Sequence, residues 1–68
     1  MHNQKMNELF LVSIDKTGDL TGIGRQKVRQ LVRTEEDLPK IVIGQTTKII
    51  LPEFKKWIIK QAEAGRIL

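Results

Sequence analysis

The residues best suited to chemistry lie between positions 22 and 33, where a glycine-containing turn leads into a basic segment. At about 100° per residue along a helix, Val28, Leu31 and Val32 share one narrow stripe. The other side and its flanks carry only polar and basic side chains, namely Arg25, Gln26, Lys27, Arg29, Gln30 and Arg33. The segment contains no acid, so its four cations repel one another, and a docking polyanion would relieve that repulsion. We therefore expect an amphipathic helix that binds DNA.

Two side-chain types in this segment can tell bases apart. Arginine presents a planar fork that bonds O6 and N7 of guanine together, and glutamine pairs with N6 and N7 of adenine. On this chemistry Arg29 and Gln26 are the expected base readers. Lysine lacks the fork, so Lys27 and Lys48 are expected to neutralise phosphates.

Length and composition limit the alternatives. A chain of 68 residues forms one small domain, which buries roughly 60% of the surface that its unfolded form exposes, so a deep catalytic cavity is not expected. It has no cysteine and a single histidine, His2, so neither disulfides nor a thiolate metal site is expected. The net charge of +4 predicts an anionic partner, but charge alone does not distinguish DNA from RNA or a lipid surface.

The sequence shows no targeting signal. Its N-terminal apolar run has only four residues, and no stretch approaches the roughly 20 apolar residues of a membrane span. We expect a cytoplasmic protein of a cell without a nucleus.

The N-terminal half predicts a strand followed by a helix. Residues 1–8 are polar and expected to be flexible, and residues 9–12 form a short buried strand or extended segment. Ser13 is a good N-cap for a helix from Ile14 to Thr21, and the amides that open this helix at Ser13 and Ile14 are expected to make a further phosphate contact. The inner side of this helix is expected to comprise Ile14, Thr17, Gly18 and Leu20.

Glycines mark the passage to the next helix. Gly18 inside a helix either allows a second helix to cross closely or is merely tolerated, at a cost of roughly 0.5–1 kcal/mol against alanine. Gly22 and Gly24 suit a turn around a buried Ile23, which predicts a helix-turn-helix. The second helix is expected from Arg25 to Thr34, and the acidic residues 35–37 that follow it are expected in a solvated loop.

The C-terminal half predicts a hairpin and a third helix. β-Branched runs at 40–43 and 48–51 flank a four-residue loop, 44–47. Pro52 then fits the first turn of a helix in which Phe54, Trp57, Ile58 and Gln61 recur at helical spacing, with Trp57 as a core anchor. Ile59 is expected on the surface, and the tail 62–68 either frays or docks on a partner.

The order of these motifs carries a family resemblance. The motifs are Leu11-Val12-Ser13-Ile14-Asp15, Leu20-Thr21-Gly22-Ile23-Gly24-Arg25, Leu38-Pro39, Ile43-Gly44 and Leu51-Pro52. They resemble the small MerR-like winged helix-turn-helix domains of excisionases, and residues 23–31 are especially similar to excisionases of conjugative transposons. The resemblance covers about 9–61 and implies an α+β fold with a short N-terminal strand, two helix-turn-helix helices, a hairpin wing and a C-terminal helix.

The resemblance implies a recombination directionality factor, without catalytic activity, that binds and bends DNA beside attachment sites. Its protein partner would be a tyrosine-type integrase that excises a mobile element, and copies would assemble cooperatively on DNA. It implies DNA contacts from the second helix, with Arg33 on phosphate, and from the wing, at Gln45, Thr46, Thr47 and Lys48. Relatives often carry basic residues in place of Thr46 and Val42, which are uncharged in this sequence.

Two other functions stay open at this point. The same fold serves small transcriptional regulators of phages and mobile elements, and a basic domain can also be a protein-interaction module. An enzyme is not expected, because Ser13 is the only serine and the acids lie on a cap, a helix face or a loop. Cofactors and metals are not expected, and a core this small predicts a free monomer that associates mainly on DNA.

Overall fold

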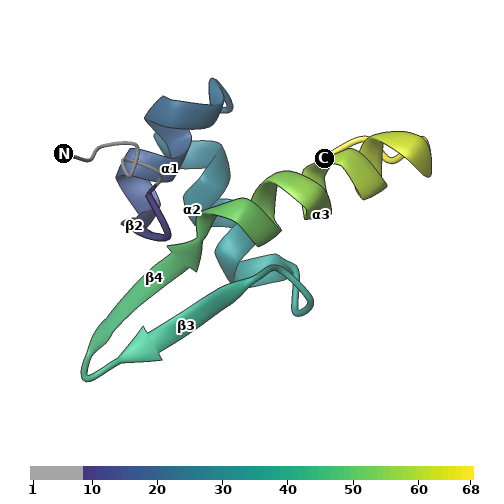
Figure 1. The fold of residues 1–68 in the computed structure, drawn as a ribbon. Coiled ribbons are helices and arrows are strands. Elements are labelled where there is room, and N and C mark those ends of the chain that lie inside the picture. The colour runs from purple at the N-terminus through teal and green to yellow at the C-terminus, as the bar shows by residue number, and fades with distance from the viewer. Residues whose placement is uncertain (1–8) are drawn as a thin grey trace, which may run out of the picture.

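The computed structural model describes residues 9–68, so the predicted flexible segment 1–8 lies outside the described residues. The elements are β2 (Leu11–Ser13), α1 (Ile14–Thr21), α2 (Arg25–Thr34), β3 (Lys40–Ile43), β4 (Thr46–Ile50) and α3 (Leu51–Glu63) (Figure 1). This composition confirms the α+β class, and the predicted bounds of the first two helices are confirmed as well.

A three-stranded antiparallel sheet joins the N-terminal strand to the β3–β4 hairpin. Its strand order is β2-β4-β3, and β2 pairs with β4 from Leu11 opposite Ile50 to Ser13 opposite Lys48. Between Lys48 and the hairpin turn, β4 pairs only with β3. The hairpin therefore projects from the helices, with its turn at the far end (Figure 1).

The start of α1 is fixed by its predicted cap. The Ser13 hydroxyl accepts a hydrogen bond from the Lys16 amide at 3.1 Å, and Asp15 lies in the first turn near the positive end of the helix dipole. The buried Thr17 donates its hydroxyl hydrogen to the carbonyl oxygen of Ser13 at 2.8 Å. Both bonds tie the helix to the end of β2.

Gly18 lies where α1 and α2 cross. A Cβ at this position would stand 2.6 Å from the carbonyl carbon of Gly24 and 2.7 Å from the Cα and amide nitrogen of Arg25. The Gly24 amide also donates to the Gly18 carbonyl oxygen at 3.1 Å. The prediction that Gly18 allows a second helix to cross closely is therefore confirmed. The turn itself requires glycine at Gly22 and Gly24, whose φ angles are 77° and 102°.

The hydrophobic core lies between the sheet, α2 and α3. Its buried members are Val12, Leu31, Leu38, Ile49, Leu51, Phe54 and Trp57, and the half-buried Ile23, the predicted plug of the turn, packs against them. The Phe54 and Trp57 rings stack with centroids 5.9 Å apart, so Trp57 is the predicted core anchor. Among residues 9–68, no helix has the length and apolar character needed to cross a bilayer.

Two predictions for the N-terminal half are wrong in detail. The strand begins at Leu11 rather than Leu9, and Phe10 is 63% exposed because only Val12 of this run reaches the core. Leu20 is 49% exposed and not on the inner side of α1. α1 packs against the start of α2 through Gly18. Leu20 follows two residues later, so its side chain points about 200° away from Gly18 around the helix axis.

The hairpin is tighter than predicted. Ile43 pairs with Thr46, so the loop contains Gly44 and Gln45 rather than four residues. Gly44 has φ 64°, and positive φ at this position is typical of two-residue hairpin turns. Leu51 belongs to α3 instead of the second strand, because its side chain enters the core and Pro52 follows in the first helical turn.

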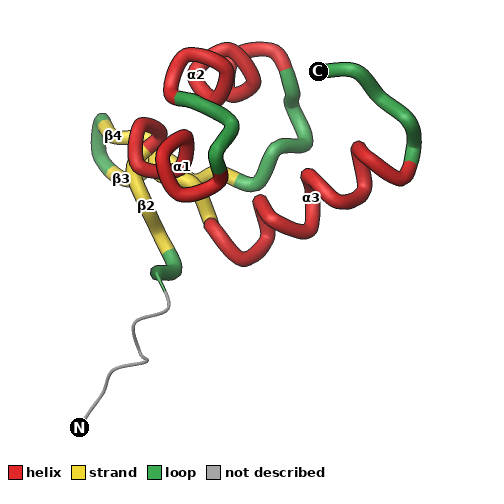
Figure 2. Tube along the Cα trace, turned by 90° about the horizontal axis from the view of Figure 1, so that it is seen from above, coloured by secondary structure: helices red, strands yellow, loops and turns green. Residues whose placement is uncertain are grey.

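The C-terminal segment folds back towards α2, as the path of the chain after α3 shows in Figure 2. Arg66 pairs with Glu35 at 3.0 Å and donates to the Gln61 side chain at 2.8 Å, and Leu68 packs against the core. The tail thus docks on its own chain, an outcome that neither fraying nor a separate partner anticipates. The Glu35 side chain is only 18% exposed, so the prediction of a solvated acidic loop is wrong for this residue.

Candidate nucleic-acid interface

One long side of α2 is open to solvent. Val28 and Leu31 point inward, and the polar and basic side chains point outward as their helical spacing predicts. An open hollow of about 530 Å³ is lined by Gln26, Arg29, Gln30, Arg33 and Thr34. The structure therefore brings four of the six predicted DNA-binding residues of this helix together on one surface.

Acids from α1 neutralise part of this surface. Nη2 of Arg29 lies 2.7 Å from Oδ1 of Asp15. Arg25 forms a two-point pair with Asp19, through Nε at 3.0 Å and Nη2 at 2.8 Å. The expectation of four mutually repelling cations is wrong for these two arginines, because it considered only the acids within α2.

These two pairs form a ladder between the helices. Asp15 and Asp19 lie one turn apart on α1, Arg25 and Arg29 lie one turn apart on α2, and the close crossing at Gly18 brings the two rows within reach. The Arg25 guanidinium, by hydrogen bonding, lowers the pKa of Asp19, and Asp19 in turn raises the pKa of Arg25. The matching spacing of acids and arginines is the signal by which the sequence could have predicted this ladder.

Lys27, a predicted phosphate contact, uses its ammonium group for hydrogen bonds within the protein. Its Nζ donates to Oε1 of Gln30 at 3.2 Å and to the main-chain oxygen of Leu68 at 2.9 Å. Its side of α2 therefore faces the returning C-terminal segment and is not an unobstructed edge. Arg33, in contrast, has no ion pair and no side-chain hydrogen bond to any of residues 9–68.

The base of the hairpin and the N-terminus of α1 lie beside this surface. Lys48 is paired across the sheet with Ser13, which directly precedes α1, and Asp15 in the first turn of α1 contacts Arg29. The projecting strands therefore start next to the end of the ladder that carries Arg29. The predicted phosphate contact at Ser13 and Ile14 therefore lies directly beside the Asp15 carboxylate, at the N-terminus of α1.

The remaining predicted residues lie along the hairpin. Gln45 is exposed in the turn, Thr46 is exposed at the start of β4, and Thr47 and Lys48 are half-buried. The neighbouring strand β3 exposes three consecutive β-branched side chains, Ile41, Val42 and Ile43. The sequence predicts a strand for these residues. It does not predict their exposure, because no polar residue alternates with them to mark a solvent face.

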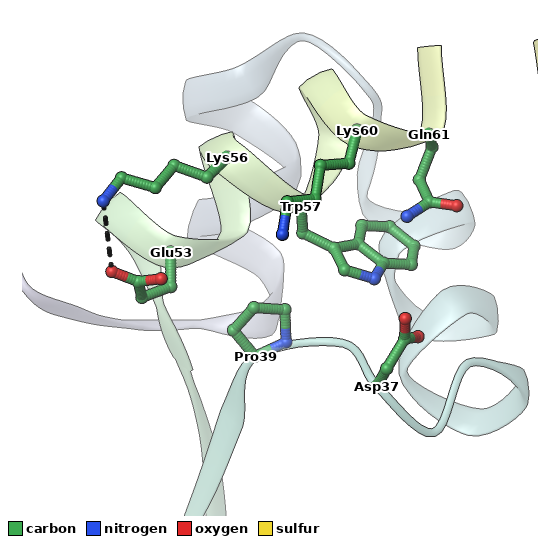
Figure 3. Close-up of a pocket in the computed structure, with 7 residues that line it drawn as sticks. All are labelled: Asp37, Pro39, Glu53, Lys56, Trp57, Lys60 and Gln61. Atoms are coloured by element: carbon green, nitrogen blue, oxygen red, sulfur yellow. Dashed lines mark ion pairs between the residues drawn. The ribbon is translucent and has the colours of Figure 1, made fainter. Parts of the chain in front are cut away.

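A second hollow, of about 330 Å³, lies between α3 and the segment before β3 (Figure 3). Its lining residues are Asp37, Pro39, Glu53, Lys56, Trp57, Lys60 and Gln61. Two lysines balance two acids, and Lys56 lies 3.6 Å from Glu53, so the lining has no excess of positive charge to attract a polyanion. The buried Trp57 Nε1 has no hydrogen-bond partner among the described residues, and the indole nitrogen faces the Asp37 side of the hollow. The charge balance of this hollow favours α2 over α3 as the candidate surface for an anionic partner.

Within residues 9–68 there is no cluster of three or more histidine, cysteine or acidic side chains that could hold a metal ion. Comparisons with protein families, curated proteins and solved structures find no match to this chain.

Proposed function

We propose that this chain binds double-stranded DNA selectively as a winged helix-turn-helix protein, with α2 in the major groove and the β3–β4 hairpin as the wing. The observation that carries the proposal is the outward row on α2. It combines two glutamines with Arg29 and Arg33 around an open hollow. Arginine can donate two hydrogen bonds to O6 and N7 of guanine, and glutamine can accept from N6 and donate to N7 of adenine.

The dimensions of α2 suit this role. A helix with side chains is roughly 10–12 Å wide, and the major groove of B-DNA is about 12 Å wide. The ten residues of α2 span about 15 Å. Gln26, Arg29 and Arg33 follow one another at intervals of three and four residues, so they lie in one row along that length.

Phosphate contacts would then come from the margins of the surface. Lys48 lies at the base of the hairpin, and Gln45 and Thr46 are exposed further along it. Arg33 lies in the last turn of α2 with no ion pair to residues 9–68. Such contacts fix the orientation of a protein on the duplex and leave the sequence to be read by the other outward residues of α2.

The biological role that we propose is that of an excisionase, which assists a tyrosine-type integrase in excising a mobile element. This step rests on the resemblance of the motif order between residues 9 and 61. The mechanical contribution that the resemblance implies would be bending of the DNA beside an attachment site.

DNA recognition is tested by selecting preferred duplexes from a random pool and measuring affinities by fluorescence anisotropy. For Arg29→Ala we expect a loss of about 1–3 kcal/mol on the selected duplex and a weaker preference over scrambled DNA. For Lys48→Ala we expect similar losses on both duplexes, because a phosphate contact does not depend on sequence.

Lys55→Ala is the matched control. Lys55 is an exposed lysine of α3, so its replacement removes one positive charge at a distance from α2. We expect at most a small, sequence-independent change. If Lys55→Ala weakens binding as much as Arg29→Ala does, or if no duplex is preferred, α2 is not the reading surface.

The excision role is tested by strand exchange with the integrase of the same mobile element. Purified protein should stimulate excision from a supercoiled substrate, and Arg29→Ala should abolish the stimulation. Selective DNA binding without any effect on excision would refute the excisionase role and favour that of a transcriptional regulator.

A further inference from the structure

We infer that Asp19, a residue of α1, determines base specificity by holding Arg25 as a preformed reader of guanine. The inference rests on the proposed DNA-binding function and extends it to a residue that need not touch the duplex. It also ranks the two paired arginines: Arg25 is held in one orientation, and Arg29 is not.

The hydrogen-bonding edges of Arg25 carry the inference. A guanidinium has five N–H donors in a planar fork. Asp19 accepts from Nε and Nη2, which together form the side edge of that fork. The end edge, formed by Nη1 and the second hydrogen of Nη2, makes no hydrogen bond to residues 9–68. That end edge has the spacing to bond O6 and N7 of guanine together.

The surroundings keep this edge accessible and the pair in place. The Arg25 side chain is 56% exposed and Asp19 is 52% exposed, so a base can approach without displacing any core residue. Arg25 is the first residue of α2, and its backbone is pressed against α1 at Gly18, the residue directly before Asp19. The hydrogen bond from the Gly24 amide to the Gly18 carbonyl oxygen holds the two backbones together at this point, so the guanidinium orientation is set before DNA arrives.

Asp15 and Arg29 provide a natural comparison. Their contact is a single one, between Nη2 and Oδ1 at 2.7 Å, and no two-point geometry accompanies it. One contact leaves the guanidinium plane free to rotate about it, whereas two parallel bonds fix the plane. Asp15 therefore contributes charge to this surface, and Asp19 contributes charge and orientation.

The test compares Asp19→Asn with Asp15→Asn, two variants with the same charge change one helical turn apart. Affinities are measured on the selected duplex, on duplexes with each guanine replaced in turn, and on scrambled DNA. Both variants should bind scrambled DNA somewhat more tightly, because each loses one negative charge. Only Asp19→Asn should lose discrimination at one guanine, by about tenfold within the 5- to 150-fold that a two-point contact supplies.

A second readout follows the free protein. The Arg25 Nε–H proton should give a slowly exchanging NMR signal that persists in Asp15→Asn and disappears in Asp19→Asn. Arg25→Lys should lose the same guanine preference as Asp19→Asn, since lysine has no fork. Trp57 fluorescence during urea unfolding identifies any variant that fails to fold, and Asp19→Ala then replaces Asp19→Asn.

The outcomes separate the two proposals. If the wild-type protein prefers no sequence, the proposed function fails and the inference fails with it. If the wild-type protein is selective but Asp19→Asn and Asp15→Asn have the same specificity ratio, the inference alone is overturned. Loss of the same guanine preference in Asp19→Asn and Arg25→Lys, with Asp15→Asn unaffected, supports it.

Discussion

Replacing Gly18 with alanine tests the contact on which both the turn and the ladder depend. The added methyl carbon would lie 2.6–2.7 Å from backbone atoms of Gly24 and Arg25. Relaxed contacts between carbon atoms are about 3.5–4.0 Å, so the start of α2 must move away by about 1 Å. Backbone atoms cannot rotate aside as a flexible side chain can.

The expected cost is a sizeable share of the stability of so small a domain. Overpacking of this kind costs about 1–3 kcal/mol, and alanine returns about 0.5–1 kcal/mol through its better helix propensity. We expect a net loss of about 2 kcal/mol, near the upper end, because moving the start of α2 would also stretch the hydrogen bond from Gly24 to Gly18. A domain of this length has a free energy of unfolding of roughly 3–10 kcal/mol.

The measurement is urea and thermal unfolding followed by Trp57 fluorescence and circular dichroism. A loss of about 2 kcal/mol should lower Tm by about 8–16 °C. Gly22→Ala is the control: its φ is 77° but nothing lies within 4 Å of the added carbon, so it reports backbone strain without a clash. Gly18→Ala should also disturb the Arg25 Nε–H signal, and Gly22→Ala should not. A Gly18→Ala protein as stable as the wild type would refute the close-crossing explanation.

Three further predictions concern acid, capping and salt. Arg25 lowers the pKa of Asp19 below its ordinary 3.8, so this pair stabilises the fold above that pH and the contribution is lost as pH falls through the lowered value. Urea titrations at a series of pH values should therefore show a smaller loss of unfolding free energy at acid pH for Asp19→Asn than for the wild type. Ser13→Ala should lower the free energy of unfolding by about 0.5–2 kcal/mol, since it removes the acceptor for the Lys16 amide, whereas Ser13→Thr should retain most of it. If roughly four to six phosphates are contacted, log affinity should fall with log salt at a slope of about −4 to −5, and a slope near zero in anisotropy titrations would contradict an electrostatic footprint.

Local signals made much of the fold predictable. Ser13 fixed the start of α1, and the stripe of Val28 and Leu31 fixed the inward face of α2. Errors arose where tertiary contacts decide. Leu51 follows a β-branched run and is therefore expected in a strand, but it lies in the first turn of α3, where its side chain is part of the core.

The site was predictable only in part, for a similar reason. Helical spacing placed Gln26, Arg29 and Arg33 on one surface, and the structure has them there. The partners of the cations could not be deduced within α2, because the acid that pairs with Arg29 comes from the preceding helix and Lys27 contacts Leu68 at the far end of the chain. Such contacts depend on how the helices cross and on how the tail returns.

Strand β3 has a practical consequence for work with the protein. It lies at the margin of the sheet, and its backbone groups on the outer side have no strand to pair with among residues 9–68. An apolar strand margin is a template on which further strands can assemble into aggregates. Concentrated samples should therefore precipitate through the hairpin, and Val42→Lys, on an exposed position outside the core, should raise solubility without loss of thermal stability.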